Sequence, residues 1–255
     1  MSRRSSTPRW RGAELIGILL VLFGLLFLLR NAGVVRLEWG ALGALFIVGL
    51  GLVLLVGALL PRGGGVSATS VPRDGTARLD LDLGVGAGTF RIGGGARELV
   101  EVRSQEDDVA TSVERGAGTT RVRIRQRADW FPFGWHGAYA WEVALAEDVP
   151  IAFVLAAGAG DFTIDLAPLR IVDARISAGA AQVRLTLPRP SGEVRVNVSA
   201  GAASVAIRVP PGVEAKITTS GLMSIEGRNE TPGFATASDR VLVSVSGGAS
   251  SLKIV

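Results

Sequence analysis

A short alternating pattern of apolar and polar residues recurs along the carboxyl-terminal part of the chain, and a cluster of small residues interrupts each copy. In one copy, Val194, Val196 and Val198 precede the cluster, and Val205 and Ile207 follow it. Such alternation places every other side chain on one face of a strand. The pattern therefore predicts pairs of short strands joined by a tight corner.

The small-residue corners return at a nearly constant interval. Ile176–Val183 reads ISAGAAQV and Val198–Val205 reads VSAGAASV, and related segments lie before and after them. Aligned on the central glycine, the spacings are 21, 22, 20 and 27 residues. The aligned glycines are Gly158, Gly179, Gly201, Gly221 and Gly248. A repeat of about 20 residues indicates coils that bury their apolar faces only by stacking. We predict a mainly β, repeat-built, β-solenoid-like domain over residues 77–255.

The repeat also predicts the core of this domain. Residues 79–92 form a less regular first copy, and from Trp141 the ladder is expected to run regularly to an uncapped last turn, Ser251–Val255. The side chains expected to face inward are Phe162, Ile164, Leu166, Val172, Ile176, Val183, Leu185, Leu187, Val194, Val196, Val198, Val205, Ile207, Val209, Ile217, Ile225, Val241, Val243, Val245, Leu252 and Ile254.

Two long apolar runs lie near the amino terminus. Leu15–Leu29 and Gly40–Leu60 carry no charged residue, and a polar turn of about ten residues separates them. A helix that crosses a bilayer needs about 20 apolar residues. We therefore predict a two-helix transmembrane hairpin with a basic amino-terminal tail over residues 1–60. Residues 61–76 are rich in glycine, serine and proline, which is typical of a flexible linker.

A cleaved signal peptide is the alternative interpretation of the first run, because four arginines precede it. No small-residue cleavage site follows Leu29, however, and a second apolar run does, which favours an anchor. More arginines flank the outer ends of the two runs than the turn between them, and basic residues favour the cytoplasmic side. We expect a multi-pass protein of the cell membrane with its carboxyl-terminal domain in the cytoplasm.

The charge distribution argues against a nucleic-acid partner. The formal net charge is +4, but residues 1–61 contain six arginines and two glutamates, whereas residues 62–255 are balanced. The chain has no cysteine and one histidine, so an ordinary zinc site or a histidine-based triad lacks its parts. Paired carboxylates for polysaccharide hydrolysis are not evident either. We expect no catalytic, cofactor-binding or metal-binding residue, and hence no enzyme.

An arginine-rich strand is the first candidate contact surface. Arg121, Arg123, Arg125 and Arg127 alternate with other residues, so a strand presents them on one face. One interpretation is a solvated face balanced by nearby acids. The other is a surface for an anionic partner, either lipid headgroups or an acidic protein.

An aromatic loop over residues 130–141 is the second candidate. Six of the chain's fifteen aromatic residues lie in it, and its proline and glycines argue against regular structure. It could cap the end of the solenoid, or it could form an exposed apolar patch that docks a partner or a membrane. The candidate contact residues in this loop are Trp130, Phe131, Phe133 and Trp135.

Two regions of the sequence resemble one known family. Residues 12–60, with Gly17, Gly24 and the Arg30–Asn31 turn, are similar to the membrane region of LiaF/LiaI-type proteins of the bacterial response to cell-wall-active antibiotics. The Gly-Ala-Gly corners over residues 77–255 resemble the β-rich carboxyl-terminal domains of LiaF-like proteins and their toast-rack relatives. The resemblance implies a regulator of envelope-stress signalling in the bacterial cell membrane that restrains a partner sensor kinase, with no catalytic motif to transfer.

Two functions follow from these observations. The first is a non-enzymatic, membrane-anchored regulatory or interaction protein that binds a membrane sensor partner. The second is a self-assembling structural scaffold, because open solenoid ends present unpaired strands that can stack.

Overall fold

The computed structural model describes residues 47–48, 67–104, 109–126 and 139–255. Residues 47–48 are helical, and twelve strands account for the rest of the regular structure in these ranges. The prediction of a mainly β protein is confirmed. Among these residues no helix is long and apolar enough to cross a membrane, and the predicted hairpin falls on residues outside the described ranges.

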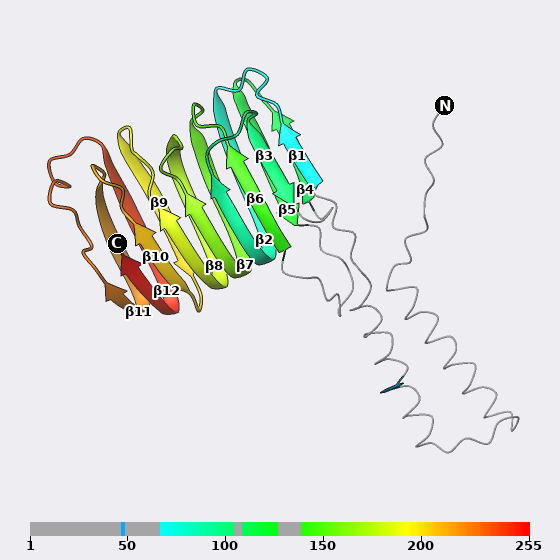
Figure 1. Ribbon diagram of the computed structural model, residues 1–255. Coiled ribbons are helices and arrows are strands. Elements are labelled where there is room, and N and C mark those ends of the chain that lie inside the picture. The colour runs from blue at the N-terminus through cyan, green and yellow to red at the C-terminus, as the bar shows by residue number, and fades with distance from the viewer. Residues whose placement is uncertain (1–46, 49–66, 105–108, 127–138) are drawn as a thin grey trace, which may run out of the picture. The chain divides into compact units, whose positions relative to one another are not determined.

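The twelve strands form one body (Figure 1). They are β1 (Ser67–Val71), β2 (Arg78–Gly93), β3 (Val100–Ser104), β4 (Val109–Arg115), β5 (Thr119–Gln126), β6 (Tyr139–Leu145), β7 (Ile151–Asp165), β8 (Ile171–Thr186), β9 (Glu193–Ala200), β10 (Ser204–Arg208), β11 (Glu214–Glu226) and β12 (Arg240–Ile254).

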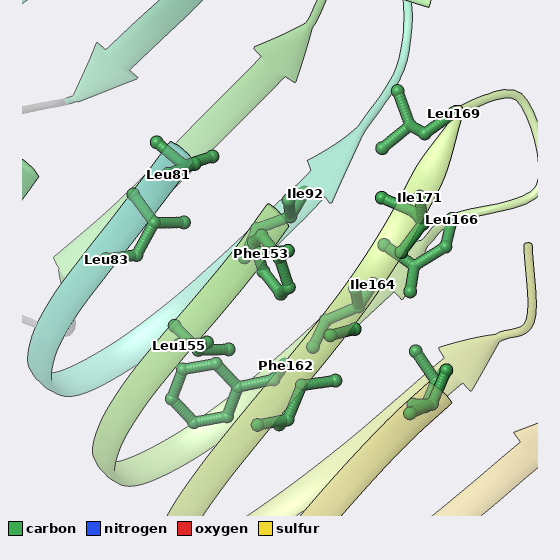
Figure 2. Packing of buried hydrophobic residues seen from close by; sticks show 14 of the residues in the cluster. Leu81, Leu83, Ile92, Phe153, Leu155, Phe162, Ile164, Leu166, Leu169 and Ile171 are labelled. Atoms are coloured by element: carbon green, nitrogen blue, oxygen red, sulfur yellow. The ribbon is translucent and has the colours of Figure 1, made fainter. Parts of the chain in front are cut away.

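The long strands bend near their glycine-rich middles, so each has a first arm and a second arm (Figure 2). The first arm of β2 pairs with β5, whereas its second arm pairs with β6. β9 and β10 supply the two arms of another coil, because β8 pairs with both. The first arms, with β4, β5 and β9, make layer one. The second arms, with β1, β3, β6 and β10, make layer two.

The coils stack in parallel, but not in the order of the chain. β7 pairs directly with β2, and β5 and β6 pair with β2 as well. At the other end, β12 pairs with β9, β10 and β11, so it lies between the β9–β10 coil and β11 (Figure 1). The prediction of a regular ladder ending at Ser251–Val255 is therefore wrong, because β11 is the outermost strand.

β11 and β12 stack in the reverse of their order in the chain, and their side chains explain why. Val241, Val243 and Val245 of β12 face inward and are almost fully buried, in register with three valines of β9. The corresponding first arm of β11 offers Ala215, Ile217 and a threonine. An interior coil has neighbours on both sides, so the strand with the more apolar inward row gains more from that position.

The inward side chains of both layers fill one continuous core (Figure 2). Phe90 and Phe162 stack with their ring centres 5.0 Å apart, and Trp141 meets Phe90 edge-on at 5.7 Å. Most of the predicted inward residues are buried, although Val209 and Ile254 are only partly so.

The prediction of burial is wrong for two residues, Val172 and Ile225. Val172 is 40% exposed because the pairing of β7 with β8 shifts at this point, which leaves Val172 as an extra residue and turns Ile171 inward. Ile225 is 49% exposed. It does lie in the core row, but on the outermost strand, where no coil of the described part of the chain covers it.

Two predicted boundaries also differ from the structure. β1 falls within residues 61–76, the expected linker, yet Val71 is buried and the whole strand pairs with β3. The expected aromatic loop over residues 130–141 ends too late, because Tyr139 and Trp141 belong to strand β6. The alternation in these short strands is too brief to be recognised as a pattern.

Candidate interaction surfaces

The glycine corners form a column along one edge of the body. A Cβ atom on Gly158 would lie 2.5 Å from the carbonyl oxygen of Gly86, and one on Gly179 would lie 2.6 Å from that of Gly158. The corresponding distance is 3.0 Å at Gly201 and 3.3 Å at Gly248, whereas on the outermost strand a Cβ atom on Gly221 would again clash with a carbonyl oxygen, that of Gly247. Only glycine permits the close approach at the tight corners. The column therefore sets the spacing of the coils at this edge.

A shallow groove of about 600 Å³ runs beside this column. Its lining consists of alanine, glycine and serine. Ser177, Ser199, Ser246 and Ser220 follow one another in register across four strands and point outward. The Ser199 and Ser246 hydroxyl oxygens lie 3.1 Å apart. The groove is consequently lined by small, uncharged side chains and is open to solvent.

The arginine face of β5 is balanced by acids of its two neighbouring strands. The Arg125 guanidinium donates to both carboxylate oxygens of Asp82, at 2.7 and 3.0 Å. Arg123 donates to Glu114 at 2.8 Å, and Arg121 lies 3.6 Å from Asp80. The hydrogen bonds to Asp82 raise the pKa of Arg125 above its ordinary value. Exposed pairs of this kind contribute only about 0–1 kcal/mol each, but they neutralise the surface.

The aromatic candidates lie outside the described residues, as does Arg127, but the ends of their segment are placed. Gln126, the last residue of β5, accepts a hydrogen bond from the Gly86 amide at 2.6 Å through its side-chain oxygen. Tyr139, the first residue of β6, pairs with Gly88. Both ends of the aromatic segment therefore lie at the glycine-corner edge of the body.

The sequence is similar to one characterised family model. The model named N-terminal domain of toast_rack, DUF2154, matches residues 63–208, which is more than half of the chain. The chain belongs to the toast-rack family. The match begins just before β1 and ends at the last residue of β10, so β11 and β12 lie beyond it.

Two solved structures are similar to the chain to different degrees. A candidate cell adhesion protein from Clostridium sporogenes is 19% identical and has a TM-score of 0.67, over 74% of this chain and 98% of its own. A candidate adhesin from Bacteroides fragilis is 9% identical, with a TM-score of 0.30 over 75% and 97% of the two chains. No curated protein matches the sequence. The first likeness supports the toast-rack fold and nothing beyond it.

Sequence reasoning missed a half-cap at the β11 end of the toast-rack body. The segment 228–239 returns along the first arm of β11. The Ile217 amide donates to the Asn229 carbonyl at 2.7 Å, and Phe234 is buried beneath Lys216 and Arg240, whose charged groups lie 5.8 and 5.5 Å from its ring centre. The available signal was an aromatic residue, Phe234, in an otherwise polar segment.

Arginine contacts also tie this half-cap to β9. Arg240 donates two hydrogen bonds to the carboxylate of Glu193, at 3.0 and 3.3 Å, and Arg195 donates one at 3.1 Å. The hydrogen bonds from Arg240, and to a smaller extent that from Arg195, lower the pKa of Glu193 below its ordinary value. In the part of the chain that the structure describes, no group of three or more His, Asp or Glu side chains could hold a metal ion.

Proposed function

We propose that this protein is a non-enzymatic regulator, anchored in a bacterial cell membrane by residues 1–60, whose toast-rack body binds a membrane sensor partner in cell-envelope stress signalling. The body suits recognition by shape, because its arginine face is neutralised by its own acids. The resemblance of residues 12–60 to LiaF/LiaI-type proteins supports the membrane and signalling parts of the proposal.

One observation carries the choice of contact surface. Gln126 and Tyr139 place both ends of the aromatic segment at the glycine-corner edge, the edge that further along also carries the uncharged serine row. Exposed aromatic residues are the commonest anchors of protein interfaces. Trp130, Phe131, Phe133 and Trp135 are therefore the proposed anchors, and the arginines of β5 are proposed as further polar contacts.

A capture experiment from bacterial membranes tests this proposal. The full chain would be compared with a variant carrying Trp130→Ala, Phe133→Ala and Trp135→Ala, and with Val172→Ala as the matched apolar control. We expect the native chain and the control to retain one membrane protein that the triple variant loses. Deletion of the chain should change the signal of an envelope-stress reporter. Equal retention by the triple variant would contradict the role of the aromatic segment, and an unchanged reporter on deletion of the chain would contradict the signalling role.

The side of the membrane is a separate part of the proposal. We propose that both termini and the body are cytoplasmic, because the outer ends of the two apolar runs carry more arginines than the turn between them. Protease added to intact cells should leave the body uncleaved and should digest it once the membrane is permeabilised. Cleavage in intact cells would reverse the assignment.

A further inference from the structure

β11 leaves an unpaired strand edge at one end of the body, from the end of its first arm across the bend at Gly221, where the register with β12 shifts, and along its second arm. The outer side of its first arm is covered, because the Thr231 amide donates to the Ala215 carbonyl at 3.0 Å and Lys216 bridges to Glu230. From Thr218 to Glu226, β12 is the only described strand that pairs with β11, and it lies on the inner side. The backbone groups of the outer side are thus free to pair with another strand.

Apolar side chains are exposed along this same edge. Leu222 is 84% exposed and Ile225 is 49% exposed. Ile225 is in register with Leu252, which is buried, and the same row continues through buried Val205 and Val183. The exposure of Ile225 therefore comes from a missing neighbour and not from an outward orientation.

The opposite end of the body does not offer a matching surface. There the parallel coils are followed by strands of reversed direction, with β4 antiparallel to β5 and β3 antiparallel to β6. The outermost strand of layer one, β4, carries Glu114 and Arg115, both in ion pairs, and the outermost strand of layer two, β1, has five residues. Charged and short edge strands resist pairing, so continued head-to-tail stacking is disfavoured.

We propose that β11 pairs antiparallel with β11 of a second copy of this chain, about a two-fold axis near Leu222 and Met223. Residues 218–226 contain no proline or lysine and one charged residue, Glu226. In the antiparallel arrangement each Glu226 lies opposite the uncharged Thr218–Ser220 stretch of the other copy, so that no like charges oppose one another.

The proposed pairing is self-limiting. A two-fold contact uses the same patch on both copies, and it therefore closes at a dimer, whereas a head-to-tail contact would generate a filament. The interface is small, so the pairing is weak in dilute solution and strengthened when both copies are confined together. This inference does not depend on the proposed signalling partner.

Cysteine cross-linking of the full chain in membranes tests the pairing, because the native chain contains no cysteine. Leu222→Cys lies near the proposed axis and should form a disulfide-linked dimer upon mild oxidation. Glu226→Cys alone should not, because its two copies lie at opposite ends of the paired strands. A mixture of Glu226→Cys and Thr218→Cys chains, or of Glu226→Cys and Ser220→Cys chains, should cross-link. Ser112→Cys, on the exposed face of β4, is the collision control.

The pattern of products decides the question. Equal cross-linking of Leu222→Cys and Ser112→Cys would overturn the proposal as random collision. A preferred product between Leu222→Cys and Ser112→Cys chains would indicate head-to-tail stacking instead. A Leu222→Cys adduct with a different protein would show that a foreign strand occupies this edge.

A charge variant gives an independent measurement. Leu222→Lys places two like charges beside the axis, and its largely exposed side chain cannot disturb the core. We expect its dimer dissociation constant in detergent to rise by about tenfold or more, with no change for Val172→Lys. An unchanged dissociation constant for Leu222→Lys, or a strictly monomeric native chain in both detergent and membranes, would overturn the proposal.

Discussion

The two ends of the toast-rack body differ in how the stacking of parallel coils is stopped. At the β2 end, the strands reverse direction, and the aromatic rings of Phe90, Phe162 and Trp141 fill the core. At the β11 end the strands stay parallel, the core is aliphatic, and only the first arm of the outermost strand is covered. A repeat protein needs a terminator at each end, and here one terminator is complete and the other covers half of the edge.

The largest contrast is expected between core residues of the same row. Phe162→Ala removes a fully buried ring that stacks on Phe90, so it should lower the free energy of unfolding by about 4 kcal/mol. Ile225→Ala, on the open end, should cost about 1 kcal/mol because its side chain is already half exposed. Urea unfolding followed by circular dichroism measures both, and equal costs would contradict the difference in packing.

Two corners of the glycine column, Gly158 and Gly248, should differ in their tolerance to a side chain. Gly158→Ala forces a Cβ atom against the backbone carbonyl of Gly86, which cannot move aside as a flexible side chain could. We expect the free energy of unfolding to fall by about 3 kcal/mol. Gly248→Ala, where the gap is wider, should cost less than about 1 kcal/mol. The midpoint of urea unfolding is again the measurement. A larger loss at Gly248 would mean that the corner is held by something other than this contact.

The half-cap should be separable from the rest of the body. Phe234→Ala should cost about 2 kcal/mol, because the ring is buried at the rim between two cations. The effect should be local: the Ile217 amide, which donates to Asn229, should lose hydrogen-exchange protection while amides of β7 keep theirs. A uniform loss of protection would show that the half-cap and the core unfold together.

The smallest expected effects are electrostatic and again differ between the ends. The pKa values of Glu193 and Glu101 both lie below the ordinary 4.5, the first because of hydrogen bonds from Arg240 and Arg195, the second because of those from the backbone amides of Arg97 and Glu98. A carboxyl whose pKa is lowered by folding stabilises the protein above its unfolded pKa, and this contribution is lost as the pH falls through the folded value.

Glu193→Gln and Glu101→Gln should therefore each destabilise the protein slightly at neutral pH, and the difference from the native chain should shrink as the pH falls below 4.5. Added salt should weaken the effect of Glu193→Gln more than that of Glu101→Gln, because salt screens ion pairs more than hydrogen bonds to amides. Thermal unfolding at several pH values and salt concentrations measures both, and an identical salt response would contradict the assigned causes.

Local patterns predicted much of the toast-rack body. Alternation and glycine spacing are properties of neighbouring residues, so they identified the strands of the repeat, the corners and most of the core, but not β1 or the start of β6. The bulge at Val172 was missed because it depends on how β8 pairs with β7. The order of the coils was missed because it too depends on strand pairing. The neighbour of β12 is set by how well its whole inward row of side chains matches that of another strand. The half-cap of residues 228–239 could not be placed without knowing that β11 is outermost.

The interior position of β12 has a consequence for synthesis. A chain emerging from the ribosome amino terminus first delivers β11 well before β12, yet β12 must lie next to β9 and β10. Until residues 240–254 have emerged, β11 either waits or pairs temporarily in the slot that β12 later takes. Completion of this body is thus coupled to the arrival of its final strand, and a chain stopped before β12 would leave β9 and β10 without their native neighbour.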